Sequence, residues 1–525
     1  MTLREDALHT LQQSEVWDMV VIGGGATGLG VAVEAASRGL RTALIERADF
    51  AKGTSSRSTK LVHGGVRYLE QMNITLVLDA LRERGYMLRN APHLCHPFSF
   101  VVPMYSLLAL PYYAAGLTLY EKLSGSLSLG PSQVLSRAST MAALPGVQSD
   151  GLRGGVLYKD GQFDDARYIV ALLRTLQDLG GVALNYVEAT GLLQSQGQTA
   201  GVRARDTETG EVFELRAKAV INATGVFSEE LLKMDGSAGG PLLSVSQGSH
   251  VVLPRTFLPG DNALMIPKTS DGRVLFAIPW HDVIVVGTTD EPVATSSMEP
   301  RAMDAELRFL MEYVTRYLGR RPAVSEVKSV WSGLRPLVRA GGGATSKLSR
   351  DHHVFVSPTG LITITGGKWT TYRKMGEDTV NRACELHGLK AQASATKDLK
   401  LHGWLAPDAV CSGDWSAVYG ADLPALQAMV EAQPELGRKL HPHLPFVAAE
   451  VIWAARYEMA RCTEDVLARR TRALFMEARA AIECAPMVSA LLAKELGRDE
   501  AWSERDLERF NEVALGYLYV ESSAS

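Results

Sequence analysis

The stretch that decides the fold is DMVVIGGGATGLGVAVEAASRGLRTALIE, residues 18–46. Its first apolar run, MVVI, is typical of a buried parallel strand. An Ala- and Val-rich stretch then predicts a helix, and the run TALI predicts a second strand. Three glycines spaced G-x-G-x-x-G stand between the first strand and the helix. This order predicts a βαβ unit that binds a dinucleotide.

The residues of this motif have separate physical tasks. Gly23 permits the tight turn, Gly25 lets backbone approach a pyrophosphate, and Gly28 lets the helix pack on the strand. The helix N-terminus, at Ala26 and Thr27, offers free N–H groups and a positive dipole. Glu46 ends the second strand and is placed to accept hydrogen bonds from a ribose. A lone G-x-G-x-x-G also occurs in βαβ units whose glycines serve packing alone, but the complete strand-helix-strand-acid order favours the dinucleotide site.

Two later segments indicate FAD rather than NAD. KAVINATG, residues 218–225, is an apolar strand that runs into Ala223, Thr224 and Gly225, and it resembles the strand with which large flavoproteins complete their FAD-binding sheet. ITITGGKWTT, residues 362–371, predicts a strand, a turn at Gly367 and Lys368, and a helix capped by Thr370 or Thr371. A helix N-terminus beside Lys368 would stabilise the negative charge that a reduced flavin acquires. The alternative is a plain surface lysine.

The segment TSSRSTKLVHGGVRYLE, residues 54–70, follows Glu46 closely. Its polar side chains are expected to bond the pyrophosphate and ribityl chain of the cofactor: Thr54, Ser55, Ser56, Ser58 and Lys60. His63, Gly64 and Gly65 would let backbone press against the isoalloxazine. Arg67 and Tyr68 would then lie beyond the ring, where a substrate binds. A solvated linker is the alternative, but the interspersed apolar residues favour a site.

The sequence as a whole resembles the aerobic FAD-dependent glycerol-3-phosphate dehydrogenase family. The resemblance rests on VIGGGATGLG, TSSRSTKLVHGGVRYLE, DDARY, NATG, QGSHVVLPR, IPWHDVIVVGTTD, SGLRPL, SRDHHV and GGKWTTYRKM. It covers about residues 16–385 and continues more loosely at YEMARCTEDVLARRTR. It implies oxidation of sn-glycerol 3-phosphate to dihydroxyacetone phosphate by hydride transfer to FAD, with electrons passed to a membrane quinone or another respiratory-chain acceptor.

The resemblance also assigns substrate contacts to Arg67, Tyr68, His250, Arg335 and Arg350. Residue chemistry agrees, because arginines bind phosphate and histidine is the best proton acceptor near neutral pH. We therefore assign His250 as the base, Arg335 as its electrostatic partner and Lys368 as the third catalytic group. Taken singly, each arginine is as often a structural ion-pair member.

The expected fold class is α/β, with a Rossmann-like FAD-binding domain, an inserted antiparallel substrate sheet and a C-terminal helical domain. Short alternating runs between residues 249 and 289 carry the hairpin signals. The predicted boundaries are 1–82, 157–241 and 341–390 for the FAD-binding domain, 83–156 and 242–340 for the substrate domain, and 391–525 for the helical domain. In the last, the basic cluster Arg469, Arg470 and Arg472 predicts a solvated helix face or an internal ion-pair set, with docking on anionic lipid as the minor alternative.

Composition restricts the partners. A net charge of −4, from 54 basic and 58 acidic residues, argues against nucleic acid. Five scattered cysteines without a C-x-x-C pattern predict reduced thiols in the cytoplasm and no metal site. The uncharged run at residues 97–120 is long enough to span a bilayer, but Pro103 and Pro111 interrupt it. A buried core segment or a surface that dips into the inner leaflet, making the protein peripheral, are the two open interpretations.

Other functions on the same motifs stay open. An oxidase that passes electrons to O₂ and makes H₂O₂ would use the same pocket. An amine oxidase is disfavoured by the cationic groups, and a non-redox protein that keeps the dinucleotide fold for binding is the alternative of another class. The sequence leaves open the physiological acceptor, covalent attachment of FAD and the oligomeric state, with a homodimer among the options.

Overall fold

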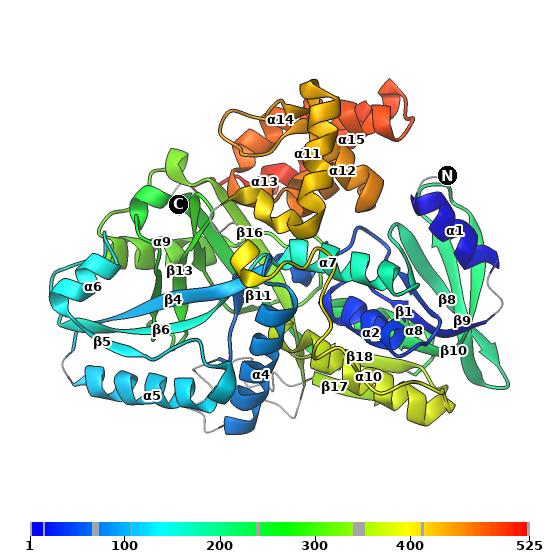
Figure 1. Ribbon diagram of the computed structural model, residues 1–525, viewed down its shortest axis with the longest axis horizontal. Helices are drawn as coiled ribbons and strands as arrows, with labels where there is room; N and C mark the ends of the chain where they lie inside the picture. The colour runs from blue at the N-terminus through cyan, green and yellow to red at the C-terminus, as the bar shows by residue number, and fades with distance from the viewer. Residues whose placement is uncertain are drawn as a thin grey trace.

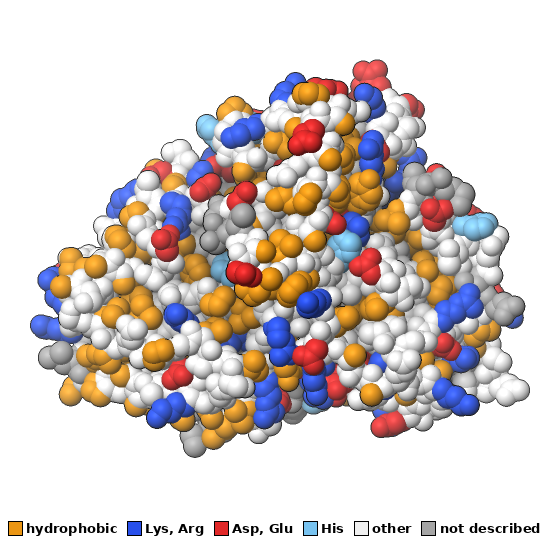
Figure 2. Space-filling model, viewed as in Figure 1, with side chains coloured by type: hydrophobic (Ala, Val, Ile, Leu, Met, Phe, Trp, Pro, Cys, Tyr) orange, Lys and Arg blue, Asp and Glu red, His pale blue; other side chains and the backbone are white. Residues whose placement is uncertain are grey.

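The computed structural model describes residues 3–13, 16–65, 73–106, 108–237, 242–339, 352–410 and 414–521. Figure 1 shows an eight-stranded sheet with its helices at the right, a ten-stranded sheet at the left and C-terminal helices above both. On the face drawn in Figure 2, basic and acidic side chains are interspersed. The fold class predicted from the sequence is confirmed.

The first sheet has the order β17-β18-β10-β1-β2-β7, and β9 and β8 extend it from β10. Its centre is parallel, because β1 lies between β10 and β2 in parallel register and β18 joins β10 in the same direction. The strands are β1 (Trp17–Ile22), β2 (Thr42–Ile45), β7 (Val182–Leu184), β8 (Val187–Ser195), β9 (Gln198–Asp206), β10 (Val212–Asn222), β17 (His352–Val356) and β18 (Ile362–Gly366). The predicted strands at residues 19–22, 42–45 and 218–222 are all in this sheet.

Helices cover this first sheet. They are α1 (Leu3–Gln13), α2 (Ala26–Ser37), α7 (Asp165–Asp178), α8 (Ser228–Met234) and α10 (Tyr372–His387). The glycine-rich turn leads directly into α2, which packs against α7 and α10. The predicted cap at Thr371 lies at the N-cap position of α10, although its side chain makes no capping hydrogen bond.

The second sheet has the order β15-β11-β14-β13-β12-β4-β6-β3, with β16 beside β11 and β5 beside β6. Its pairs are antiparallel except β12–β4. The predicted hairpins are confirmed, and β13 turns into β14 through His281 in the left-handed region at φ 51°. The strands are β3 (Leu61–Val62), β4 (Cys95–Met104), β5 (Gln133–Ser136), β6 (Gly154–Phe163), β11 (Leu243–Pro254), β12 (Ala263–Ile266), β13 (Leu275–Trp280), β14 (Val283–Gly287), β15 (Glu291–Pro292) and β16 (Ser329–Val338).

The predicted domain boundaries remain a prediction. β6 crosses the boundary placed at residue 157, and β3 pairs with β6 rather than with the first sheet. The helices attached to the second sheet are α4 (Ile74–Asn90), α5 (Ala109–Leu123), α6 (Arg137–Ala143) and α9 (Asp304–Leu318). The C-terminal helices are α11 (Leu423–Ala432), α12 (Ala448–Tyr457), α13 (Ala473–Met476), α14 (Ala478–Glu495) and α15 (Glu500–Ala514), with a π-helical turn at Asp465–Arg470.

The uncharged run at residues 97–120 divides into two different structures. Its first half lies in β4, where residues 100–104 are buried. Its second half forms α5, and Pro111 is tolerated because it lies in the first turn of that helix. In the described part of the chain, no helix combines the length and the apolar content that crossing a bilayer requires.

The basic cluster Arg469, Arg470 and Arg472 is buried, each side chain being at most 2% exposed. All three arginines pair with buried carboxylates. The internal ion-pair interpretation is therefore correct, and docking of these side chains on lipid is wrong.

Candidate active site

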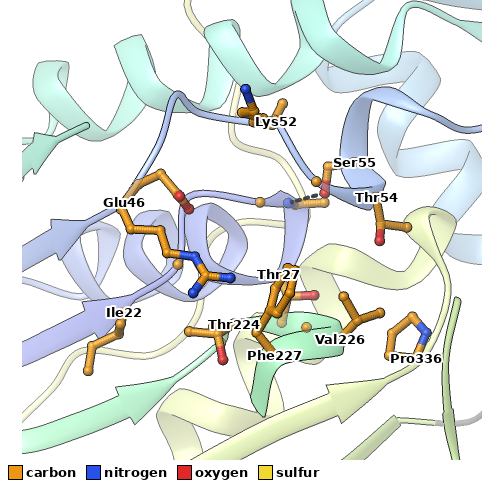
Figure 3. Close-up of a pocket in the computed structure, with 18 of the residues that line it drawn as sticks. Ile22, Thr27, Glu46, Lys52, Thr54, Ser55, Thr224, Val226, Phe227 and Pro336 are labelled. Atoms are coloured by element: carbon orange, nitrogen blue, oxygen red, sulfur yellow. Dashed lines mark hydrogen bonds between the residues drawn. The ribbon is translucent and has the colours of Figure 1, made fainter. Parts of the chain in front are cut away.

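A pocket that is open to solvent lies where β1, β10 and the N-terminus of α2 meet. Figure 3 shows side chains from the loop after β2 facing those from the end of β10 across it. The predicted cofactor residues that line it are Gly23, Gly25, Ala26, Thr27, Glu46, Thr54, Ser55, Ala223, Thr224, Gly225, Gly367 and Lys368. Segments hundreds of residues apart in the sequence thus meet in one place.

The glycine turn has the geometry that a pyrophosphate needs. Gly23 has φ +115°, which side-chain-bearing residues rarely adopt. A Cβ on Gly25 would lie 2.9 Å from Ser55 Oγ, and a Cβ on Gly28, which does not line the pocket, would overlap the Gly23 carbonyl oxygen. The turn therefore leaves a cradle of bare backbone at the positive end of α2. These contacts explain the glycines at all three positions.

Glu46 is held in place by two backbone donors. Gly24 N donates to Oε2 at 2.6 Å, and Ala48 N donates to Oε1 at 2.9 Å. Burial raises the pKa of Glu46, and these two hydrogen bonds oppose the rise. The carboxylate thus lines the pocket in a fixed orientation, where a ribose hydroxyl could donate to it.

The segment that begins at Thr54 divides into two parts. Thr54 and Ser55 line the pocket, and Ser55 Oγ accepts from Ala26 N at 2.9 Å. Ser58 Oγ and Lys60 Nζ instead donate to the Asp165 carboxylate, each at 2.7 Å. Neither residue lines the pocket, and a buried acid on α7 binds both side chains; their contact with the cofactor remains a prediction.

Four further predicted cofactor residues lie behind or beside the pocket lining. Ser56 is buried, and its carbonyl accepts from Lys60 Nζ at 2.8 Å. Gly64 N donates to Tyr120 Oη at 2.7 Å. Thr370 Oγ1 lies 3.5 Å from the His63 carbonyl oxygen, which places the His63–Gly64 backbone beside the Gly367–Lys368 turn. Binding of a cofactor at these four residues remains a prediction.

The predicted catalytic groups His250 and Arg335 lie on the neighbouring antiparallel strands β11 and β16. The His250 ring stacks on Trp331 with centroids 3.9 Å apart, and its Nε2 is 3.0 Å from Thr59 Oγ1. Its Nδ1 is buried and has no hydrogen-bond partner among the described residues. Burial, followed by the charges of Lys60 and Arg335, lowers the pKa of His250 well below its usual value. The imidazole is therefore neutral at pH 7.

Arg335 reaches toward His250 across Gly248. A Cβ on Gly248 would overlap the Arg335 guanidinium, so the arginine occupies the space that the missing side chain leaves. Arg335 Nη1 pairs with Asp290 at 3.2 Å, and Nη2 donates to the Thr289 carbonyl at 2.9 Å. The next residue, Pro336, lines the pocket, so β16 connects the pocket with this pair. Arg67, Tyr68 and Arg350 lie outside the described residues.

A family model described as FAD dependent oxidoreductase matches residues 18–373, and one described as the C-terminal domain of alpha-glycerophosphate oxidase matches residues 359–503. The chain is also 40% identical over 560 residues to the mitochondrial glycerol-3-phosphate dehydrogenase of Rattus norvegicus, covering 99% of this chain and 75% of that one. The chain belongs to the FAD-dependent glycerol-3-phosphate dehydrogenase family.

Other relatives agree with this assignment. The mitochondrial glycerol-3-phosphate dehydrogenase of Schizosaccharomyces pombe is 35% identical, over 96% of this chain and 88% of that one. The solved glycerol-3-phosphate dehydrogenase from Bacillus halodurans, complexed with FAD, superposes with a TM-score of 0.81 at 27% identity, over 100% of both chains. The cofactor of the family is FAD, and the glycine cradle, the fixed Glu46 carboxylate and the α2 N-terminus fit its dinucleotide half.

Several pocket residues were not predicted from the sequence. Lys52 and Gly53 precede Thr54 directly, so their position in the chain could have indicated them. Glu188 and Ala189 on β8, and Met298 in a connecting segment, carry no motif. Only the folded arrangement brings these three residues to the pocket.

Proposed function

We propose that the protein oxidises sn-glycerol 3-phosphate to dihydroxyacetone phosphate and passes the electrons to a membrane quinone. FAD, when bound, supplies the hydride acceptor. The observation that carries the proposal is the placement of the buried His250 and of Arg335 on the paired strands β11 and β16, of which β16 reaches the dinucleotide pocket through Pro336. His250 takes the proton of the C2 hydroxyl, and Arg335 binds the phosphate or the developing alkoxide. Lys368, at the turn before α10, adds positive charge to the flavin side of the pocket.

The acceptor is tested by supplying the purified protein with glycerol 3-phosphate and either a soluble quinone analogue or O₂ alone. Dihydroxyacetone phosphate formed only with the quinone supports the proposal. Rapid O₂ consumption with stoichiometric H₂O₂ would instead make the protein an oxidase, as the match to the C-terminal domain of alpha-glycerophosphate oxidase allows.

The site of membrane contact in this proposal is α5. Leu108, Tyr112 and Leu119 are 92%, 60% and 51% exposed, and the sequence spacing of 4 and 7 residues puts them on one face with Ala115. The opposite face is buried through Leu117 and Tyr120. An uncharged apolar stripe on a surface helix is suited to lie in the headgroup region of a bilayer without crossing it.

Co-sedimentation with vesicles tests this contact. The double variant Leu108→Asn and Leu119→Asn should lose vesicle binding, because two apolar anchors are replaced by amides. Val212→Asn is the matched control, since Val212 is 56% exposed on β10 of the other sheet. Equal binding of both variants and the unaltered protein would exclude α5 as the contact.

A further inference from the structure

The loop that connects β2 to β3 forms much of the pocket wall. We define the cofactor loop as residues 46–58; Glu46, Lys52, Thr54 and Ser55 within it line the pocket. Apart from the three-residue 3₁₀ turn at Thr54–Ser56, this loop has no helix or strand. A wall built from irregular backbone needs other parts of the molecule to fix its shape.

The C-terminal region supplies those contacts through one short segment. We define the arginine segment as residues 464–472. Glu464 pairs with Lys52 at 2.6 Å, and Arg470 binds both Asp49 oxygens, at 2.7 and 2.9 Å. Arg469 Nε also donates to Asp49, at 2.5 Å. The arginine segment therefore forms ion pairs with the cofactor loop at Asp49 and at Lys52, which are both more than 400 residues away in the sequence.

Arg472 makes a third connection, deeper in the molecule. Its Nη2 donates to the Ser56 carbonyl and to Asp165, both at 2.9 Å. Asp165 also accepts from Ser58 and Lys60, so one carboxylate joins α7, the loop and the arginine segment. Burial would raise the pKa of Asp165, but the charges of Lys60 and Arg472 lower it, and the acid is ionised.

The backbone at Arg472 is in the left-handed region, at φ 66°. For a residue other than glycine this conformation is unfavourable and persists only where the surroundings determine it. Buried ion pairs also contribute little to the free energy of unfolding, because desolvation offsets much of their attraction. Apolar residues of equal volume in their place would often give the same or greater stability. Stability alone therefore does not account for the buried ion pairs of Arg469, Arg470 and Arg472 and for the strained turn in the same segment.

We infer that the arginine segment positions the cofactor loop for FAD binding, so that the C-terminal region is a part of the cofactor site. Arg470 and Arg472 are positioning residues that act through Asp49, Asp165 and the Ser56 carbonyl, without lining the pocket. Because linkage is reciprocal, bound FAD stabilises the docking of the C-terminal region as much as this docking favours FAD. The inference rests on the proposed function only in requiring that the protein bind FAD.

The test measures the FAD dissociation constant of apoprotein variants by flavin fluorescence. Arg472→Met should raise this constant about tenfold or more, within the range usual for coupled sites. Arg472→Lys restores a cation beside Asp165 and should recover part of the loss. Free FAD at saturating concentration should return turnover toward that of the unaltered protein, which a merely structural defect would not allow.

Glu464→Gln is the second variant, because a neutral, isosteric change at a side chain 11% exposed leaves the core packing intact. Its control is Glu495→Gln, which breaks the Arg456 pair within the same C-terminal region, away from the loop. We expect weaker FAD binding and faster tryptic cleavage after Lys52 or Arg57 in Glu464→Gln only. Unaltered FAD affinity in Glu464→Gln and in folded Arg472→Met would overturn the inference, whereas failure of the unaltered protein to bind FAD would overturn the proposed function instead.

Discussion

Gly248→Ala tests the placement of Arg335 without altering any polar group. The new Cβ would lie 2.5 Å from Thr288 Oγ1 and would overlap the Arg335 guanidinium, closer than the 3.0 Å below which real Cβ atoms essentially never approach another heavy atom. The guanidinium must therefore move away from its present position beside Asp290 and Thr289. If Arg335 binds the substrate phosphate, this movement removes at least one charge-assisted hydrogen bond.

Such a bond contributes about 1.5–3 kcal/mol, and a factor of ten corresponds to about 1.4 kcal/mol. The expected rise in KM for glycerol 3-phosphate is therefore about 10- to 150-fold. A rise in KM at constant kcat would indicate that Arg335 binds the substrate equally well in the ground state and in the transition state. Equal falls in kcat and in kcat/KM would instead place Arg335 at the developing alkoxide.

Steady-state kinetics with a soluble quinone measures both constants. Gly191→Ala is the matched control, because a Cβ at Gly191, on β8, meets no atom within 4 Å. Kinetics indistinguishable from the unaltered protein in a folded Gly248→Ala variant would refute the substrate contact assigned to Arg335.

Three further predictions follow from described side chains. His250→Ala should lower the rate of flavin reduction in a single turnover by about 10²–10⁴ if His250 is the base. Burial, Lys60 and Arg335 lower the pKa of His250. The rate of the unaltered protein should therefore stay level as the pH falls from 7.5 to about 6.5, the ordinary pKa of histidine. His402 lies between Asp422 and Asp178, and its hydrogen bond to Asp422 is the largest cause that raises its pKa. Protonated His402 therefore stabilises the folded protein fully below about pH 6.5, and this stabilisation is lost as the pH rises through the raised pKa. The free energy of unfolding, measured with urea, should depend less on pH in His402→Gln than in the unaltered protein. Gly28→Ala should destabilise the FAD-loaded protein by about 1–3 kcal/mol, measured by thermal unfolding, because its Cβ would overlap the Gly23 carbonyl oxygen.

The parts predicted best from the sequence depend on short-range constraints. Gly23, Gly25 and Gly28 lie within six residues of one another, so their spacing indicated the turn, the helix and the adjoining strand, and the contact that excludes a side chain at Gly28 is with Gly23 of the same turn. The hairpins of the second sheet were predicted for the same reason. Alternating apolar residues and turn residues lie next to each other in the chain, and they give the β13–β14 pairing directly.

The parts that could not be predicted depend on partners far away in the chain. Ser58 and Lys60 look like cofactor ligands because both are polar, yet Asp165, more than 100 residues later, binds them. The same holds for Arg469 and Arg470, whose charge pattern resembles a solvated helix until Asp49 is placed beside them. In the uncharged run, composition alone could not separate the buried strand β4 from the exposed face of α5, because both need apolar residues.

In the proposed reaction, a bound flavin takes a hydride from a three-carbon phosphate ester beside His250 and Arg335. Anaerobic addition of sn-glycerol 3-phosphate to the FAD-loaded protein measures this most directly, through the visible absorbance of the oxidised flavin. We expect the absorbance to bleach with glycerol 3-phosphate and to persist with glycerol alone or with glycine. Persistent absorbance with glycerol 3-phosphate in a folded protein that holds FAD would contradict the proposed reaction.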